Sequence, residues 1–233
     1  GLSATVTDLG SQFVTDGIKT VSSAISFEGS ASLSLNTDSG DSASDGITNN
    51  GEVTVAGLFP GFRWEYSTDN GGNWTSKDAN TNTFELEGQV SGGDGVTYAT
   101  GAVQVRQINP FGARSETISN SSTIVVDKIS DPDLMFNAGS GGTVSREALF
   151  RGTGAEAGAT ILLSADDGQG GTIQGGTTNM EPDGSWYNKF WSGLAHGTTY
   201  TISAQQTDIA GNVGELLVGP VVTSDEEDRK LLM

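Results

Sequence analysis

The stretch GTTYTISAQQTDIAGNV, residues 197–213, decides the fold class, because an alternating run leads directly into a polar turn that contains glycine. The run YTISAQQ within it has the period-two pattern of a β-strand with one buried face. The same alternation recurs in EVTVA at 52–56, AVQVRQ at 102–107 and TIVV at 123–126. The sequence therefore predicts short strands, and no segment has the periodicity of an amphipathic helix.

Turn-forming residues separate these runs. They occur as SDG at 44–46, TDNGG at 68–72, ADDG at 165–168 and PDG at 182–184. Asp, Asn and Gly supply the side-chain hydrogen bonds and the positive φ angles that tight turns need. Short strands with turns at this spacing predict an all-β fold made of tandem immunoglobulin-like β-sandwich domains.

Two parts of the chain repeat one another. GVTYATGAVQVRQINPFGA at 95–113 corresponds to the stretch at 197–213, and LFPGFRWEYSTDNGG at 58–72 corresponds to AEAGATILLSADDGQGG at 155–171. Tyr98 and Tyr200 lie 102 residues apart, about the length of one sandwich domain. We therefore predict two domains of equal kind in tandem.

The predicted boundaries follow from the last strand of each repeat. Residues 29–127 form the first copy and residues 128–225 the second copy, and each ends on an aspartate. Residues 1–28 align with the last two strands of a copy, so we expect either the end of a preceding repeat or an N-terminal hairpin. Residues 226–233 read as a charged tail.

Composition restricts the possible functions. The 233 residues include 29 acids and 11 bases, a formal charge of −18, and no cysteine. Such a charge disfavours binding to nucleic acid or to an anionic membrane surface. Without thiolates, a bound metal would need oxygen ligands, although most of the acids are expected to be solvated surface. No apolar run could span a bilayer, and we expect a soluble, monomeric segment of a longer protein.

Several local patterns resemble the bacterial immunoglobulin-like repeats of giant secreted adhesins. They are NTDSGDSASDGITNNGEVTVAGL from Asn36, WEYSTDNGGNW from Trp64, GAVQVRQ from Gly101, and DGSW with TDIAGN in the second copy. The first copy departs from the pattern, because INPFGA places Asn109 where an acid is usual and FPGF replaces the acidic AEAGA turn.

The resemblance implies a function as well as a fold. It implies an extracellular, cell-surface protein exported by type I secretion, of the kind that ends in nonapeptide calcium repeats. Its repeats would contact neighbouring repeats of the same chain, bind calcium in their linkers, and hold bacteria to a surface or to one another in a biofilm. The partner on that surface could be a host or matrix glycan or protein, without membrane insertion.

A calcium (Ca²⁺) site also follows from topology. In a seven-strand sandwich the B–C and F–G loops lie at the end where the chain enters, beside the last strand of the preceding domain. In the second copy these segments carry six oxygen ligands: Asp127, Asp131, Asp133, Glu156, Asp208 and Asn212. Because neighbouring carboxylates repel one another, we expect a hard cation with six to eight oxygen ligands between the two copies.

Other acidic segments leave alternatives open. The loop with Asp38, Asp41 and Asp45 fits either a second calcium site or turns that bond their own backbone, because no glutamate follows at the twelfth position of an EF-hand. The pairs Asp69–Asn70 and Asp166–Asp167 are predicted to form hairpin turns. The joint before the first copy carries one acid, Glu28, and we expect no calcium of this kind there.

Catalysis is not expected. The single histidine, His196, falls in a predicted surface turn, and the paired acids fall in loops suited to metals. Trp64 and Tyr66 are predicted to share a core face, and of Phe190 and Trp191 only one can face inward. Two other functions remain: a module that binds a glycan or peptide, and a surface-layer structural module.

Overall fold

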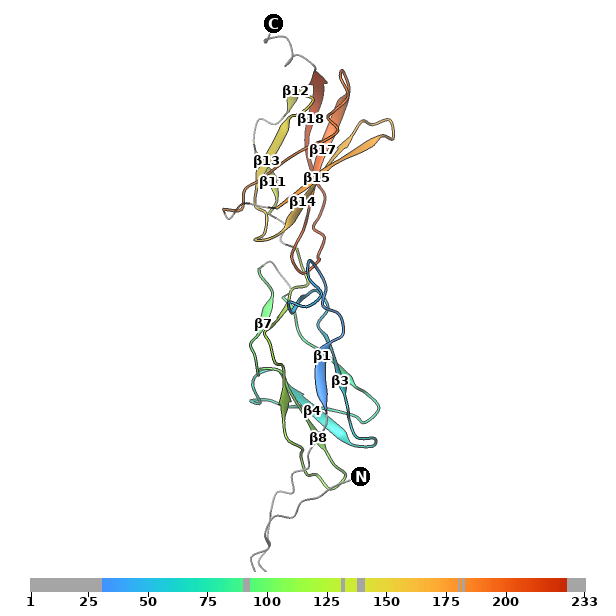
Figure 1. Cartoon of the computed structure of the whole chain (residues 1–233), viewed down its shortest axis with the longest axis vertical. Coiled ribbons are helices and arrows are strands. Elements are labelled where there is room, and N and C mark those ends of the chain that lie inside the picture. Colours follow the sequence, from blue (N-terminus) through green and yellow to red (C-terminus); the bar gives the residue numbers. More distant parts are fainter. Residues whose placement is uncertain are drawn as a thin grey trace, which may run out of the picture. The chain divides into compact units, whose positions relative to one another are not determined.

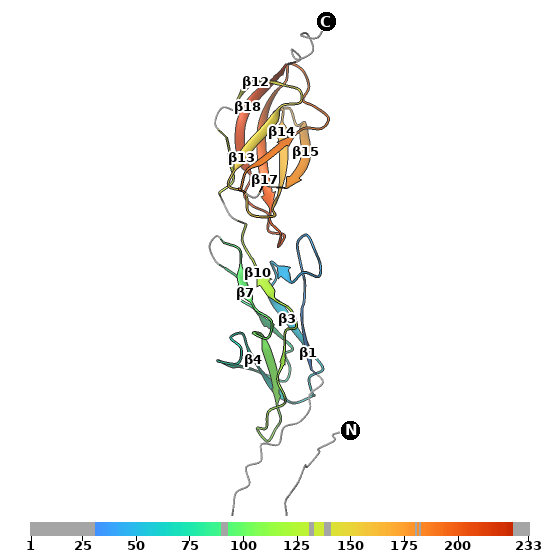
Figure 2. The ribbon, with the colours of Figure 1, turned by 60° about the vertical axis from the view of Figure 1, so that its left-hand side comes forward.

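The computed structural model describes residues 31–89, 93–130, 133–137, 141–179, 181 and 183–225. Within these ranges every regular element is a β-strand, so the all-β prediction is confirmed (Figures 1 and 2). The predicted runs at 52–56 and 200–206 fall on strands, and the runs at 102–107 and 123–126 overlap strands that begin at Gln104 and Ile124. Residues 1–28, the tail at 226–233 and Glu28 lie outside the described residues.

The first copy contains ten strands in the described residues. They are β1 (Ser32–Leu35), β2 (Ile47–Thr48), β3 (Glu52–Ala56), β4 (Arg63–Ser67), β5 (Thr75–Lys77), β6 (Thr83–Glu85), β7 (Val96–Tyr98), β8 (Gln104–Ile108), β9 (Ile118–Ser119) and β10 (Ile124–Val126). They form three sheets, in the orders β1-β3-β6, β2-β10-β7 and β5-β4-β8-β9.

The second copy contains eight strands in the described residues. They are β11 (Met135–Phe136), β12 (Gly142–Ser145), β13 (Leu149–Thr153), β14 (Thr160–Asp166), β15 (Thr172–Asn179), β16 (Trp186–Lys189), β17 (Thr199–Thr207) and β18 (Leu217–Asp225). They form two sheets, β11-β13-β16 and β12-β18-β17-β14-β15.

Both copies have the immunoglobulin-like arrangement in which the first strand is shared between two sheets. In the second copy β11 pairs with β13 and the following β12 runs parallel to the last strand, β18. In the first copy β1 belongs to the sheet of β3, and β2 runs parallel to the last strand, β10. The shared topology confirms the predicted fold class.

The first copy also differs in the strand that leads into its polar turn. Tyr98 and Ile108 are ten positions apart, whereas their counterparts Tyr200 and Thr207 are seven apart. The three additional residues interrupt pairing, so β7 and β8 are separate where β17 is continuous. The polar turns that follow are nevertheless alike, because each begins with an isolated bridge, Ile108 to Arg114 and Thr207 to Val213.

The core of the second copy lies between its two sheets (Figure 2). Alternate residues of β14 and β17 are buried, including Ile161, Leu163 and Ile202, and they meet Phe150 and Trp186 of the other sheet. Fully burying side chains of this size contributes roughly 1.5–3 kcal/mol each, which makes the core the main source of stability.

The aromatic predictions are confirmed. Trp64 is fully buried, and Tyr66 stacks on Phe84 with ring centroids 4.2 Å apart. Phe190 is buried, whereas Trp191 is 72% exposed. Both residues follow the end of β16 at Lys189, and only Phe190 packs into the core of the second copy.

The described residues fall into two compact units. Unit 1 takes in Val53–Phe84 and Tyr98–Thr123 with the chain up to Ser34. Unit 2 takes in Leu35–Glu52, Glu85–Thr97 and the chain from Ile124 onward. The units differ from the predicted domains 29–127 and 128–225, because three segments of the first copy, 35–52, 85–97 and 124–127, belong to unit 2; the domain boundaries stay a prediction. The described residues include no helix that could cross a membrane.

Candidate functional site

The turn that follows β17 fixes the position of one buried acid. Asp208 is 2% exposed, and its Oδ1 accepts a hydrogen bond from the backbone N–H of Asn212 at 2.8 Å. Backbone bonds from Asp208 N to Asn212 O, at 3.0 Å, and from Gly211 N to Asp208 O, at 3.2 Å, close the same turn. An Asp or Asn is favoured at this place because its short side chain accepts from its own turn.

Asn212 joins this turn to a second buried acid. Its Nδ2 donates to the backbone oxygen of Asp127 at 2.8 Å and to Asp208 Oδ2 at 2.8 Å. Asp127 is 5% exposed and follows directly after β10. The amide of Asn212 therefore links the Asp208 carboxylate to the backbone carbonyl of Asp127, from a distant part of the sequence.

Asp127 lies in an electrostatically unfavourable place. Burial raises the pKa of Asp127, and the nearby charges of Asp208 and Asp94 raise it further. Hydrogen bonds to Asp127 Oδ1 from the side chain of Gln89 and from the backbone of Ile129 act in the opposite direction and do not cancel the effect. A positive charge here would favour the ionised form of Asp127.

A loop of the first copy packs on the same turn within unit 2. Ser39 Oγ donates to the backbone oxygen of Ala210 at 2.7 Å. The backbone N–H of Asp41 donates to the backbone oxygen of Ile209 at 3.3 Å. Gly40 has a φ of 90°, and a Cβ there would lie 2.0 Å from the oxygen of Ile209. Ala210 is completely buried as a result.

The predicted ligands are placed as follows. Asp127, Asp208 and Asn212 are brought together by the contacts above. Glu156 is half-buried, and its N–H donates to Gln206 Oε1 at 3.3 Å. Asp133 has an exposed side chain, and Asp131 lies outside the described residues.

Gln206 connects the Glu156 turn to the chain that enters the second copy. Its Nε2 donates to Ser130 Oγ at 2.9 Å, while its Oε1 accepts from Glu156. Gln206 itself is 1% exposed. This buried amide therefore orders the linker and the B–C turn relative to one another.

The loop with Asp38, Asp41 and Asp45 shows features of both alternatives. Asp45 Oδ1 accepts from the backbone of Ile47 at 3.0 Å, an Asx-type turn. Asp38 Oδ2 accepts from the backbone of Gly46 at 3.0 Å, but its buried Oδ1 has no hydrogen-bond partner among the described residues. Asp41 and Asp45 have exposed side chains.

The other acidic turns are hairpins, as predicted. Asp69 Oδ1 accepts from the backbone of Asn73 at 2.8 Å between the paired strands β4 and β5, and local hydrogen bonds of this kind lower the pKa of Asp69 to about 2. Asp167 Oδ1 accepts from the backbone of Gly171 at 2.9 Å between β14 and β15. His196 lies in an exposed turn, with Nδ1 3.5 Å from Asp225 Oδ1.

Three contributors were missed by sequence reasoning: Gln89, Asp94 and Ser39. Gln89 and Asp94 lie between β6 and β7, and Ser39 lies between β1 and β2. The topology could have found the first two, because the loop between β6 and β7 lies at the same end of a sandwich as the exit of its last strand. The contact of Ser39 has no sequence signal.

The ligand chemistry fits a hard cation only in part. Asp127, Asp208 and Asn212 offer oxygens, which calcium prefers, and calcium completes its shell with backbone carbonyls and water. Within the part of the chain that the structure describes, no group of three or more His, Cys, Asp or Glu side chains is arranged to hold a metal ion. A calcium ion here would need further oxygens beyond these side chains.

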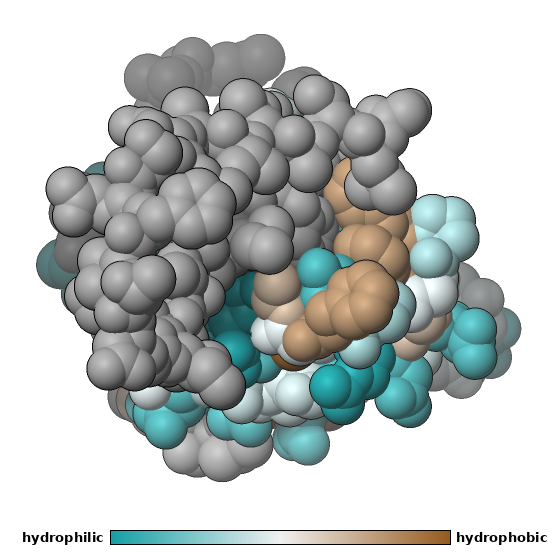
Figure 3. Space-filling view, turned by 90° about the horizontal axis from the view of Figure 1, so that it is seen from below, coloured by the Kyte–Doolittle hydropathy of each residue, from teal (hydrophilic) through white to brown (hydrophobic). Residues whose placement is uncertain are grey.

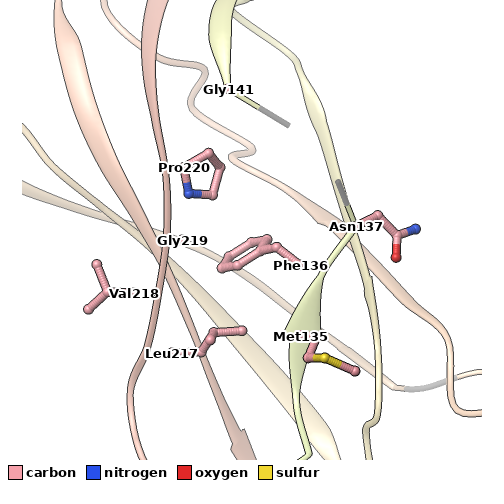
Figure 4. A pocket seen from close by; sticks show the side chains of 8 residues that line it. All are labelled: Met135, Phe136, Asn137, Gly141, Leu217, Val218, Gly219 and Pro220. Carbon is pink, nitrogen blue, oxygen red and sulfur yellow. The ribbon is translucent and has the colours of Figure 1, made fainter. Parts of the chain in front are cut away.

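A separate apolar hollow of about 400 Å³ lies between β11 and β18 (Figure 4). Phe136 and Leu217 point into the space between the two strands, with Met135 and Pro220 at its margins. The hollow has no charged side chain in its lining.

Comparison with known proteins gives likenesses in structure only. Neither a protein-family model nor a curated protein matches the sequence. One similar structure is a tetra-tandem repeat from the extending region of a large adhesion protein, with 19% identity and a TM-score of 0.32 over 82% of this chain and 48% of that one. This chain thus spans about half of that structure.

Two further structures are similar. One comes from a 1.5-MDa bacterial ice-binding adhesin, with 21% identity, a TM-score of 0.31 and coverage of 86% of this chain and 66% of that one. The other contains the FN1–FN3 domains of chicken CNTN1, with 12% identity, a TM-score of 0.39 and coverage of 80% and 68%.

Proposed function

We propose that this chain is a segment of a bacterial surface adhesin, and that calcium at the entrance of the second copy stiffens the joint between repeats. The proposed ligands are Asp127, Asp208 and Asn212, with Asp131, Asp133 and Glu156 as further candidates. The role is mechanical, with no catalysis: the repeats would carry an adhesive end away from the cell and contribute to attachment or biofilm formation.

One observation carries the calcium proposal. The amide of Asn212 joins two buried acidic residues by donating to the backbone oxygen of Asp127 and to Asp208 Oδ2, and burial with the charge of Asp208 raises the pKa of Asp127. A divalent cation would relieve this repulsion more completely than two amide protons can. To act as a ligand, Asn212 would turn its amide oxygen toward the ion.

Binding would couple segments that are far apart in the sequence. The turn at 208–212 already contacts the end of β10 and the loop with Ser39. A ligand that binds the ordered arrangement stabilises it by mass action, so each of these segments would lose freedom when calcium binds. Extracellular calcium at millimolar concentration fills sites with dissociation constants of about 10⁻⁴ to 10⁻³ M.

Secretion to the cell surface follows as part of the same proposal. The sequence resemblance supports it, and so does a charge of −18 that calcium would partly neutralise. The neighbouring repeats of the same chain are the proposed partners, and the chain would act as a monomer.

The test compares thermal unfolding in millimolar calcium and in chelator, together with small-angle scattering. Asp208→Asn is the informative variant, because Asn109 accepts the same turn hydrogen bond in the first copy at 2.9 Å. Calcium should raise the melting temperature of the natural chain by several degrees and increase the stiffness of the particle, and the variant should lose both effects.

Glu116→Gln is the matched control, since Glu116 is an exposed acid in unit 1. It should keep the full calcium response. If calcium changes neither the melting temperature nor the scattering of the natural chain, the calcium joint is wrong, and the −18 charge serves only solubility.

A further inference from the structure

One side of the sheet β11-β13-β16 faces away from the core of the second copy. Strands β13 and β16 pair so that Arg151 lies opposite Tyr187 and Leu149 lies opposite Lys189. Phe150, between the two residues of β13, points into the core, because consecutive strand residues face opposite sides of a sheet. The outward residues are accessible: Arg151 is exposed, and Leu149 and Tyr187 are 43% and 47% exposed.

Trp191 extends this side of the sheet beyond the end of β16. It is 72% exposed, and Lys189 Nζ lies 4.9 Å from the centre of its ring. The indole also rests on β15, because a Cβ at Gly176 would collide with it. The ring is therefore held between neighbours while most of its surface stays accessible. We call the following five residues the basic aromatic face: Leu149, Arg151, Tyr187, Lys189 and Trp191.

The basic aromatic face carries most of the positive charge of the second copy. Residues 133–225 contain ten acids and three bases. Two of the three bases, Arg151 and Lys189, belong to this face, and neither forms an ion pair with a described carboxylate. The third, Arg146, donates to the backbone oxygen of Leu194 at 3.1 Å. Two cations are thus available to an anion in an otherwise acidic domain.

Exposure of apolar side chains does not by itself define a site. Phe111 is 94% exposed, and apolar residues lie among hydrophilic ones on the part of the described surface that Figure 3 shows. The basic aromatic face differs because its rings and its cations lie together on one regular pair of strands. Strands hold their side chains more rigidly than loops do, which suits a binding surface.

The first copy has an acid where the second copy has Arg151. The backbone N–H of Asn36 donates to the oxygen of Glu52 at 2.8 Å, as the backbone N–H of Asn137 donates to the oxygen of Arg151 at 2.9 Å. Glu52 therefore corresponds to Arg151. The same strand of the same fold accepts either charge, so the fold does not require a cation at this position.

The neighbouring strand of the first copy shows the same difference. Leu86 N donates to Gly51 O at 2.8 Å, and this register of β3 and β6 places Glu85 opposite Glu52. Glu85 therefore corresponds to Tyr187. Continuing along both strands, the five matching residues of the first copy include three acids, no aromatic ring and no base: Asn50, Glu52, Glu85, Glu87 and Gln89. The basic aromatic face is thus a property of the second copy alone.

Exposed rings beside cations have the chemistry that recognises an acidic sugar. The face of an aromatic ring is electron-rich and attracts the polarised C–H groups of a sugar ring. A guanidinium such as that of Arg151 presents a planar fork of donors that fits a carboxylate. Lys189 supplies a second cation next to the ring of Trp191. Sugar rings that carry carboxylates match both parts of the face.

The size of the basic aromatic face favours a polysaccharide over a folded protein. A stable protein interface takes about 20–30 residues on each side, whereas this face has five. The chain also has a formal charge of −18, which repels an acidic protein over the whole of its surface. A polysaccharide chain is narrow and contacts only the side chains that lie directly beneath it.

We infer that the basic aromatic face binds an acidic polysaccharide built of uronic acids. Trp191 and Tyr187 stack on its sugar rings, and Arg151 and Lys189 pair with its carboxylates. The second copy then attaches directly to a carbohydrate, which goes beyond the mechanical role proposed above. The inference does not rest on the calcium proposal, because none of the five residues belongs to the proposed calcium set.

Isothermal titration of the full chain with a hexamer of galacturonic acid tests this inference. Chelator is present throughout, so the result does not depend on the proposed calcium joint. We expect the natural chain to bind this hexamer at least tenfold more tightly than neutral maltohexaose. Arg151→Gln removes a charged donor and Trp191→Ala removes a stacking ring, so each should weaken binding by about tenfold.

Two matched variants of unit 1 serve as controls. Arg63→Gln removes an exposed cation, and Phe111→Ala removes an exposed aromatic ring. Both should bind the acidic hexamer as the natural chain does. All four variants should keep the melting temperature of the natural chain, because each changes an exposed side chain.

Several results would overturn the inference. One is a natural chain that binds the acidic hexamer no more tightly than maltohexaose. Another is equal affinity for hexaglutamate, which would assign the face to an acidic peptide. Unchanged affinity in Arg151→Gln and Trp191→Ala, or an equal loss in the two controls, would place the sugar elsewhere on the chain.

Discussion

Asn212 donates its side-chain amide to the backbone oxygen of Asp127, 85 residues earlier in the chain, at 2.8 Å. The same amide reaches Asp208 Oδ2, so one residue holds the F–G turn of the second copy against the end of β10.

Removing the amide of Asn212 should loosen unit 2. In Asn212→Ala the buried Oδ2 of Asp208 loses the hydrogen bond that the Asn212 amide donates to it. The backbone carbonyl of Asp127 loses its hydrogen bond from the same amide. We expect a loss of about 1–2 kcal/mol in the free energy of unfolding, measured with urea in chelator. The bond from the backbone N–H of residue 212 to Asp208 Oδ1 does not need the Asn212 side chain, so the turn should survive. Unchanged stability would show that the amide makes no net contribution.

Neutralising Asp127 should stabilise the calcium-free protein. Asp127→Asn retains an oxygen that can accept from Gln89 and Ile129, but it removes the repulsion with Asp208 and Asp94. At pH 7 in chelator we expect a gain of about 1 kcal/mol. With millimolar calcium the order should reverse, because the variant lacks a ligand.

The stabilising effect of Asp127→Asn should depend on pH. Burial raises the pKa of Asp127 above its ordinary value of 3.8, so in the folded chain this carboxyl binds its proton more tightly than in the unfolded chain. Stability of the natural chain therefore falls as pH rises from 3.8 through the raised pKa, and the gain of Asp127→Asn grows over the same range. Urea titrations at several pH values would measure it. A variant that is less stable than the natural chain in chelator at pH 7 would contradict this account.

Adding one methyl group at Gly40 should disrupt the contact between its loop and the turn at 208–212. Gly40→Ala places a Cβ 2.0 Å from the oxygen of Ile209 at a φ of 90°, so the loop must move away from the turn. Gly170→Ala in the same unit has the same φ of 90° and open space around it. We expect about 1 kcal/mol of destabilisation for Gly170→Ala and about 2–4 kcal/mol for Gly40→Ala. Equal losses would mean that backbone strain alone matters.

Much of the fold could be predicted from the sequence, because alternation and turn residues are local signals. EVTVA forms β3 with the predicted bounds. The three additional residues between β7 and β8 follow from comparing the two repeats in the sequence. The site was predicted only in part. Asp127, Asp208 and Asn212 meet because topology brings loop ends together, whereas the contact of Ser39 with Ala210 depends on packing between distant segments that leaves no local pattern.

Unit 1 should weaken in acid through Glu65. This carboxylate is 4% exposed and is paired with Arg106 and with Arg114, whose Nε lies 2.9 Å away. Burial pushes the pKa of Glu65 upward, but the hydrogen bonds and charges of both arginines outweigh it, so the pKa is lowered from its ordinary value of 4.5. The stability that this group contributes is present above pH 4.5 and is lost as the pH falls through the lowered pKa.

Glu65→Gln tests this assignment. At pH 7 we expect a loss of about 1–3 kcal/mol, because two charged donors lose their carboxylate. The difference from the natural chain should shrink below pH 4.5, as Glu65 itself becomes protonated. Arg106 lies 3.7 Å over the ring of Trp74, so tryptophan fluorescence should report the change. Glu85→Gln removes a more exposed pair with Lys128 and should cost less than about 1 kcal/mol. A Glu65→Gln loss that does not depend on pH would assign the effect to packing and not to charge.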